Sequence, residues 1–123
     1  MPRFGLLLAA VMAWLAMPAT LSAAELIMVE RQGCHYCIEW KTDLGPIYPK
    51  TAEGAFAPLR VIDIADSPPP GVRFDTTVVF TPTFVLVEDG TELARIEGYP
   101  GEDFFWGLLR MMLEAKTEFK GTS

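Results

Sequence analysis

The sequence predicts an α/β fold with a central mixed sheet, built as β-α-β followed by β-β-α and flanked by helices. Three observations lead to this fold class. Two apolar runs typical of strands, residues 25–30 and 59–64, are separated by a helical segment long enough to cross over between parallel strands. An Asp-Gly turn at residues 89–90 joins two further strand-like runs. A last segment from residue 102 has apolar residues at helical spacing.

Residues 1–24 are predicted to be a secretory signal peptide, which leaves residues 25–123 as one domain. Arg3 supplies the positive start, and residues 4–17 (FGLLLAAVMAWLAM) form an apolar run. The small residues at 22–24 (SAA) suit a cleavage site. A membrane span needs about 20 apolar residues, so cleavage is favoured over a retained anchor. We therefore expect no stable membrane insertion of the mature domain.

The charge of the chain excludes several classes of partner. It carries 16 acidic and 10 basic residues, a formal net charge of −6 at pH 7, without a basic cluster. Such a surface repels nucleic acid and anionic lipid, so we expect no nucleic-acid binding. Export places the domain in the periplasm, an oxidising compartment where two cysteines normally form a disulfide.

The first half of the domain alternates between strand and helix. Residues 25–30 (ELIMVE) form a short apolar run with acidic ends, typical of a buried strand. Residues 37–44 (CIEWKTDL) have helical character, and the Gly-Pro pair that follows ends or kinks that helix. Residues 50–58 are expected to form a second helical piece, and residues 59–64 (LRVIDI) the next strand.

The second half begins with a loop at residues 66–71 (DSPPPG), because consecutive prolines cannot donate backbone hydrogen bonds. Residues 83–88 (TFVLVE) and 92–97 (ELARIE) are predicted strands of a hairpin around the Asp-Gly turn. Residues 102–119 are predicted to form the last helix, with acidic residues at its positive N-terminal end. Its apolar positions at helical spacing are Phe105, Leu108, Leu109, Met112 and Leu113.

The bulky apolar residues of the predicted helices are assigned to packing. Met111 and Met112 lie on an apolar helix face, so we expect them in the core and not in a metal site. Trp40 and Trp106 are expected in the core or as groove walls.

The segment Gly33–Trp40 (GCHYCIEW) contains both cysteines of the chain, Cys34 and Cys37, and its one histidine, His35. A structural zinc site needs four ligands, which this cluster cannot supply, so we expect no zinc. Copper(I) binding by two thiolates stays an alternative. A purely structural disulfide is disfavoured, because so small a loop removes little entropy from the unfolded chain.

Redox exchange fits the cysteine pair better. If a helix begins near Cys34, both cysteines lie on the same helix face. The helix dipole and unpaired N–H groups then stabilise a Cys34 thiolate, since such sites lower a thiol pKa from about 8.5 to about 3.5–7.5. Cys34 is thus the expected nucleophile and Cys37 the resolving thiol. A CxxC motif directly after a strand of a βαβ pattern is typical of thioredoxin-like proteins.

A second motif strengthens this interpretation. The string FTPTF places Pro82 at the start of the third strand, where a central ladder position would not accept proline. Together the two motifs resemble the thioredoxin superfamily, whose cis-proline loop faces the CxxC motif. The resemblance implies a minimal thioredoxin-like fold over residues 25–123 and a cis Thr81–Pro82 bond. An ordinary trans proline at the strand end is the alternative.

Longer strings narrow the resemblance. TAEGAFAPLRVIDI, FTPTFVLVEDG and RIEGYPGEDFFWGLL are similar to the small periplasmic SoxS-type thioredoxins of bacterial sulfur oxidation, which reduce the blocked cysteine of a sulfur-carrier protein. The resemblance implies Cys34 and Cys37 as the redox pair, without a further cofactor. It also implies Pro82 as the cis-proline. His35, because it lies next to Cys34, and Thr81, because the residue before the cis-proline faces the sulfurs in thioredoxin-like proteins, are expected with Pro82 to tune the redox pair. The residues expected to line a substrate groove are Tyr36, Gly98 and Tyr99.

The chain departs from the general thioredoxin pattern at two positions. Gly33 stands where thioredoxins usually carry tryptophan, and Met28 stands where they bury an aspartate. The usual internal proton acceptor for the resolving thiol is therefore missing. Glu30 and Glu39 are candidate replacements, although each fits an exposed surface carboxylate better. His35 either favours the thiolate as an imidazolium or is a solvent-exposed ring on the docking surface.

We therefore predict a periplasmic thiol:disulfide oxidoreductase that acts as a reductase. Its expected partners are a protein disulfide, such as that of a sulfur-carrier subunit, and a membrane-embedded electron donor. The alternatives are an oxidase or isomerase of secreted proteins, or a thiol-based copper(I) chaperone. The direction of electron transfer depends on the reduction potential of the cysteine pair. A difference of 30 mV corresponds to only about 1.4 kcal/mol, and a sequence does not determine the potential that closely.

Overall fold

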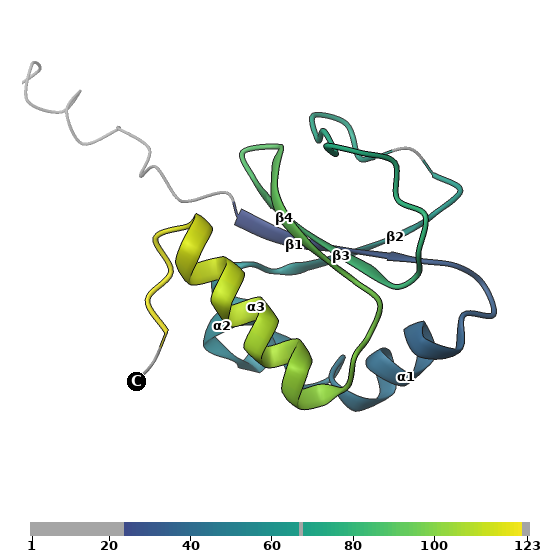
Figure 1. The fold of residues 1–123 in the computed structure, drawn as a ribbon, viewed down its shortest axis with the longest axis horizontal. Helices are drawn as coiled ribbons and strands as arrows, with labels where there is room; N and C mark the ends of the chain where they lie inside the picture. Colours follow the sequence, from purple (N-terminus) through teal and green to yellow (C-terminus); the bar gives the residue numbers. More distant parts are fainter. Residues whose placement is uncertain (1–23, 67, 122–123) are drawn as a thin grey trace, which may run out of the picture.

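A mixed four-stranded sheet organises the chain in the order β2-β1-β3-β4 (Figure 1). The computed structural model describes residues 24–66 and 68–121. The strands are β1 (Ala24–Glu30), β2 (Leu59–Asp63), β3 (Thr83–Glu88) and β4 (Thr91–Glu97). β1 pairs in parallel with β2, whereas β1 with β3 and β3 with β4 pair antiparallel. The predicted mixed sheet is confirmed.

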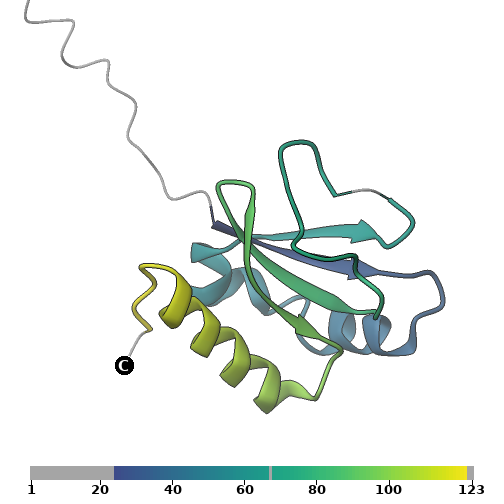
Figure 2. The same ribbon diagram turned by 45° about the horizontal axis from the view of Figure 1, so that its top comes forward.

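The helices gather on one face of this sheet (Figure 2). They are α1 (His35–Asp43), the short 3-10 helix η2 (Tyr48–Lys50), α2 (Ala52–Phe56) and α3 (Glu102–Lys116). The chain between β2 and β3 runs over the opposite face without a helix in its described part. The sheet therefore has one helical face and one face covered by irregular chain.

The helical face is held by an aromatic cluster. The ring centroid of Trp40 lies 5.1 Å from that of Phe84 and 5.5 Å from that of Phe105, and all three side chains are fully buried. Tyr48 stacks on Trp106 with an interplanar angle of 9° and donates its hydroxyl proton to the carbonyl of Ala57 at 2.6 Å. The expectation that Trp40 packs in the core is confirmed.

The Asp-Gly turn is the hairpin that the sequence predicts. Asp89 and Gly90 both adopt positive φ, at 52° and 81°. Turns of this kind match the twist of the flanking strands and need residues that tolerate positive φ. The turn joins β3 and β4 in the predicted places, and β4 begins one residue earlier than expected, at Thr91.

Several predicted boundaries are wrong. The first helix begins at His35, two residues before the helical run at residues 37–44, with Cys34 as its N-cap, as the redox interpretation expected. The second helical piece is divided into η2 and α2 at Thr51. The last helix ends at Lys116 instead of residue 119, because Thr117 adopts an extended backbone conformation and its hydroxyl accepts the N–H of Phe119.

The expectation that Met111 lies in the core is also wrong. Its side chain is 62% exposed, whereas that of Met112 is buried. Met112 shares the buried face of the helix with Phe105, Leu109 and Leu113. Met111 points about 100° further round the helix, outside that face.

The predicted signal peptide lies outside the described residues, apart from Ala24. Ala24 is the first residue of β1, where it is buried and paired with Glu88. Within the described part of the chain, no helix is both long and apolar enough to cross a membrane.

Candidate active site

Three connecting segments meet at one edge of the sheet. β1 ends at Glu30 and leads into the cysteine motif, while β3 begins at Thr83, directly after Pro82. Val29 pairs with Thr83, and Thr83 pairs with Glu97 at the end of β4. The sheet register therefore brings the segments around Cys34, Pro82 and Gly98 to the same edge.

Cys34 and Cys37 form a disulfide at the start of α1, with their Cα atoms 5.2 Å apart. Cys34 is the N-cap residue, and its sulfur accepts a hydrogen bond from the backbone N–H of Cys37 at 3.2 Å. This N–H is one of the donors that a helix leaves free at its first turn. Once the disulfide is reduced, the same donor and the helix dipole stabilise negative charge on the Cys34 sulfur.

The two sulfur-bearing side chains differ in exposure. Cys37 is 1% exposed and belongs to the core cluster on the helical face, whereas Cys34 is only half-buried. A disulfide of another protein can approach Cys34 from solvent, but Cys37 is shielded by its own domain. The arrangement thus separates a half-buried cysteine from one that its own domain shields.

Gly33 shapes the turn that presents Cys34. It adopts a φ of 78°, in the left-handed region that favours glycine. The N–H of Cys34 donates to the carbonyl of Arg31 at 3.1 Å, which closes the turn. From the sequence, Gly33 was notable only as a replacement for tryptophan, because a backbone angle leaves no residue pattern.

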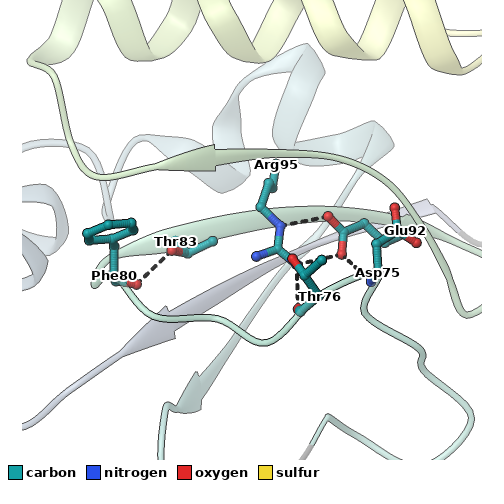
Figure 3. Close-up of polar contacts among 6 residues, drawn as sticks. All are labelled: Asp75, Thr76, Phe80, Thr83, Glu92 and Arg95. Atoms are coloured by element: carbon teal, nitrogen blue, oxygen red, sulfur yellow. Dashed lines mark hydrogen bonds and ion pairs between the residues drawn. The ribbon is translucent and has the colours of Figure 1, made fainter.

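The Thr81–Pro82 peptide bond is cis, the isomer that the family resemblance implies. Pro82 is buried, and its carbonyl accepts a hydrogen bond from the N–H of Gly98 at 2.7 Å. On the other side, the hydroxyl of Thr83 donates to the carbonyl of Phe80 at 2.6 Å (Figure 3). These two hydrogen bonds hold the backbone on both sides of Thr81, whose side chain is half-buried.

Tyr99 links the segment after β4 to the active-site helix. Its side chain is 8% exposed, and its hydroxyl donates to Oδ2 of Asp43 at 3.2 Å. Burial, with the hydrogen bond to Asp43 and nearby carboxylate charges, raises the pKa of Tyr99 to about 12. Asp43 was missed in the sequence, because the two residues are 56 positions apart and neither belongs to a motif.

The other polar residues near the cysteines lie at the surface. Nε2 of His35 is 3.5 Å from Oε2 of Glu39, and the His35 side chain is 82% exposed. Tyr36 is 56% exposed, with its ring centroid 5.2 Å from that of His35. Glu30 forms an ion pair with Lys41, which the sequence did not suggest.

At the position in β1 where thioredoxins usually bury an aspartate, this chain buries the apolar side chain of Met28.

A buried polar clamp holds the irregular segment that precedes Thr81. Arg95 donates through Nε and Nη2 to both carboxylate oxygens of Glu92 at 2.7 Å, and also to the carbonyl of Thr76 at 2.9 Å (Figure 3). Oε1 of Glu92 accepts the N–H of Asp75 at 2.8 Å. Burial alone would raise the pKa of Glu92, but the Arg95 hydrogen bonds, the Asp75 N–H and the Arg95 charge lower it.

The described residues contain no group of three or more His, Cys, Asp or Glu side chains that could hold a metal ion.

Comparison with solved structures found similarity over most of the chain. The periplasmic thioredoxin SoxS from Paracoccus pantotrophus, solved in its reduced form, is 45% identical with a TM-score of 0.73. The match covers 74% of this chain and 96% of that one.

Thioredoxin-2 of the malaria parasite, a component of its protein secretion machinery, is 18% identical with a TM-score of 0.55. That match covers 78% of this chain and 89% of the parasite protein, and it supports the fold alone. A scan of protein-family models found no match, and neither did a search of curated proteins.

Proposed function

Because the chain belongs to the thioredoxin superfamily, among the small SoxS-type thioredoxins, and is a thiol:disulfide oxidoreductase, we propose that it works in the periplasm as a reductase of protein disulfides. One observation carries the proposal. The accessible sulfur of Cys34 caps α1, while the sulfur of Cys37 is buried behind it, in a chain 45% identical to a periplasmic thioredoxin.

The proposed reaction passes two electrons to the partner in two exchanges. The Cys34 thiolate attacks one sulfur of the partner disulfide, and the other sulfur leaves as a thiolate that takes up a proton. Cys37 then loses its proton and attacks Cys34, which breaks the mixed disulfide and releases the second partner thiol. The Cys34–Cys37 disulfide is the oxidised product, and a dithiol donor embedded in the membrane returns it to the reduced state.

We propose that the physiological substrate is the blocked cysteine of a sulfur-carrier protein, on the basis of the resemblance to the SoxS type. In this proposal Tyr36 and Gly98 contact the partner. Tyr99, expected from the sequence to line the same groove, is buried and bonded to Asp43, so its role is to hold the segment beside Gly98 against α1. His35, Thr81 and Pro82 tune the reactivity of Cys34. Tyr36 and His35 are well exposed beside Cys34, which supports a contact role for that side of the site.

The test is to trap the partner with Cys37→Ser. Without the second thiol, the mixed disulfide on Cys34 has no fast intramolecular exit. The variant, expressed in its source cell and recovered after acid quenching, is expected to carry a covalent partner that reductant releases. Cys34→Ser is the matched control and should capture nothing.

The identity of the captured protein decides between the proposed roles. A sulfur-carrier subunit joined through its own cysteine supports the reductase proposal. A broad set of secreted proteins, together with a reduction potential well above that of glutathione, would favour an oxidase or isomerase. If the Cys37→Ser variant captured nothing where the wild type is active, the two-cysteine mechanism would be wrong.

A further inference from the structure

Two apolar side chains just before the cis-proline are exposed to solvent. Val79 is 65% exposed and Phe80 is 61% exposed, whereas the preceding Val78 is only 7% exposed. Among the described residues, Val79 and Phe80 belong to neither of the two apolar core clusters. The chain therefore turns outward after Val78 and presents two large apolar side chains to water. We call Val79 and Phe80 the exposed pair.

The exposed pair lies at the active-site edge of the sheet. Phe80 is two residues before Pro82 of the cis peptide bond, and β3 begins at Thr83. Thr83 pairs with Val29 of β1, the strand that leads into Cys34. Figure 3 shows the ring of Phe80 at the end of the sheet toward which β4 runs. The pair is thus continuous with the segments that surround the accessible sulfur, where a partner disulfide has to bind.

Hydrogen bonds fix the backbone on both sides of the exposed pair. The hydroxyl of the fully buried Thr83 donates to the carbonyl of Phe80 at 2.6 Å. Upstream, Nη2 of Arg95 donates to the carbonyl of Thr76 at 2.9 Å (Figure 3). A surface that is held in its conformation before binding loses less conformational entropy when a partner arrives. The pair therefore has the rigid backbone that a recognition surface needs.

The chain around the exposed pair is uncharged. Residues 76–87 (TTVVFTPTFVLV) contain no acidic or basic residue, although 21% of the whole chain is charged. Beside Cys34, the ring of Tyr36 adds a further exposed aromatic side chain, at 56% exposure. An uncharged apolar surface gains most from apolar side chains of a partner, because the contact removes apolar area of both from water.

We propose that Val79 and Phe80 are specificity-determining residues, which contact an apolar side chain within a few residues of the partner's reacting cysteine. The inference rests on the proposed function, because it concerns which protein disulfides the reductase prefers. Aromatic side chains are enriched in protein interfaces, and Phe80 is the larger member of the pair. The pair selects the partner segment, while the two sulfur atoms carry out the exchange.

The small size of the exposed pair fits a transient contact. A stable protein–protein interface uses about 20–30 residues on each side, far more than this surface offers. A disulfide reductase has to release its partner after each exchange, so a small contact beside the reacting sulfur is sufficient. The occupant is therefore the disulfide-bearing segment of a substrate protein, and not a permanent subunit.

The experiment compares two synthetic peptides that differ only on both sides of a single cysteine, where one carries leucine and the other serine. In each peptide the cysteine is blocked as a mixed disulfide with cysteamine. The reduced protein passes two electrons to this disulfide, which frees the peptide thiol and cysteamine and leaves the Cys34–Cys37 disulfide. The wild type should reduce the leucine peptide about three- to tenfold faster, which corresponds to about 0.6–1.4 kcal/mol.

The ratio of the two rates is the readout for the variants, because a general loss of activity does not change it. Phe80→Ser should bring the ratio close to one, whereas Phe80→Leu keeps an apolar side chain and should preserve the preference. Phe104→Ser is the matched control. Phe104 is also an exposed phenylalanine, at 70% exposure, but it lies on α3, so this variant should keep the wild-type ratio.

Equal rates of the wild type on both peptides would overturn the inference and leave the reductase function standing. A Phe80→Ser variant with the wild-type ratio would also overturn it. Reduction of neither peptide would instead contradict the proposed reductase function, and the inference with it. Sedimentation of the same proteins tests the other occupant. A wild-type dimer that Phe80→Ser abolishes would assign the exposed pair to a second copy of the chain and overturn the proposal.

Discussion

The two faces of the sheet are stabilised in different ways. On the helical face, large aromatic side chains fill the space between the strands and the helices, with Trp40, Phe84 and Phe105 in mutual contact. On the opposite face, smaller branched side chains such as Val85 and Val87 lie under irregular chain. That chain is held by the Glu92–Arg95 clamp, and not by a helix of its own.

The difference matters because the active site combines both faces. Cys34 and Cys37 belong to α1 on the helical face, whereas Thr81 and Pro82 end the irregular segment of the opposite face. Apolar packing therefore positions the sulfur atoms, and a few polar contacts position the segment beside them. We expect the two kinds of stabilisation to respond differently to substitution and to pH.

The largest effect is expected in the aromatic cluster. Phe84→Ala should reduce the free energy of unfolding by about 3–5 kcal/mol, because it leaves a cavity between Trp40 and Phe105. The adjacent Val85 faces the opposite side of the same strand, and Val85→Ala should cost only about 1–3 kcal/mol. Urea unfolding of both variants measures the contrast. Equal losses would mean that the two faces are packed alike.

The second largest loss of stability is expected when the Glu92–Arg95 clamp is disrupted. Arg95→Met keeps much of the side-chain volume but leaves the buried Glu92 carboxylate without its hydrogen-bonded cation, at a cost of about 1.5–3 kcal/mol. Glu92→Gln leaves the Arg95 cation without its carboxylate, but the amide oxygen of glutamine can still accept a hydrogen bond from it, and Arg95 is more exposed than Glu92, so this change should cost less. Hydrogen exchange should show faster exchange of the Asp75 amide in both variants. An Arg95→Met variant as stable as the wild type would show that the segment is held by its apolar contacts.

The clamp also predicts a dependence on acid. The pKa of Glu92 is lowered in the folded state, so its contribution is present above its ordinary pKa of about 4.3 and is lost as pH falls through the folded value. Glu92→Gln should therefore lose less stability than the wild type between neutral and acid pH. Urea unfolding at several pH values measures this, and parallel curves for the two proteins would contradict it.

A smaller loss of stability is expected when the hydrogen bond between Tyr99 and Asp43 is removed. Tyr99→Phe removes the hydrogen bond to Asp43 and should cost about 0.5–1.5 kcal/mol. Because the pKa of Tyr99 is raised to about 12, its contribution is present below the ordinary tyrosine value and is lost as pH rises toward 12. The variant should thus be less sensitive to alkali than the wild type. Tyr36→Phe, at an exposed tyrosine, is the control.

The smallest effect is expected at the exposed surface of α1. His35 and Glu39 form a pair in which both side chains are largely in solvent, and such pairs contribute only about 0–1 kcal/mol. Glu39→Gln should therefore leave the unfolding midpoint nearly unchanged. A loss of stability as large as that of Arg95→Met would show that the His35–Glu39 pair stabilises the fold as strongly as the Glu92–Arg95 clamp.

Local features of the sequence were sufficient for most of the fold. The Asp-Gly turn, the short apolar runs of the strands and the CxxC motif after a strand each depend on residues close together in the chain, so their conformations can be inferred from the residues themselves. Cys34 and Cys37 were found in this way. The end of the last helix was less predictable, because it depends on the backbone of Thr117 and on one hydrogen bond from Phe119 to its hydroxyl.

The sequence by itself thus determined the order of the elements, the hairpin and the redox pair, because these follow from short-range conformational preferences. Only the tertiary structure decided how far the buried face of α3 extends, so that Met112 packs inside while Leu108 and Met111 face solvent. It also decided that Tyr99 meets Asp43 and that Arg95 reaches Thr76. Such contacts join residues far apart in sequence, and they form only when the sheet brings their strands and loops to one place.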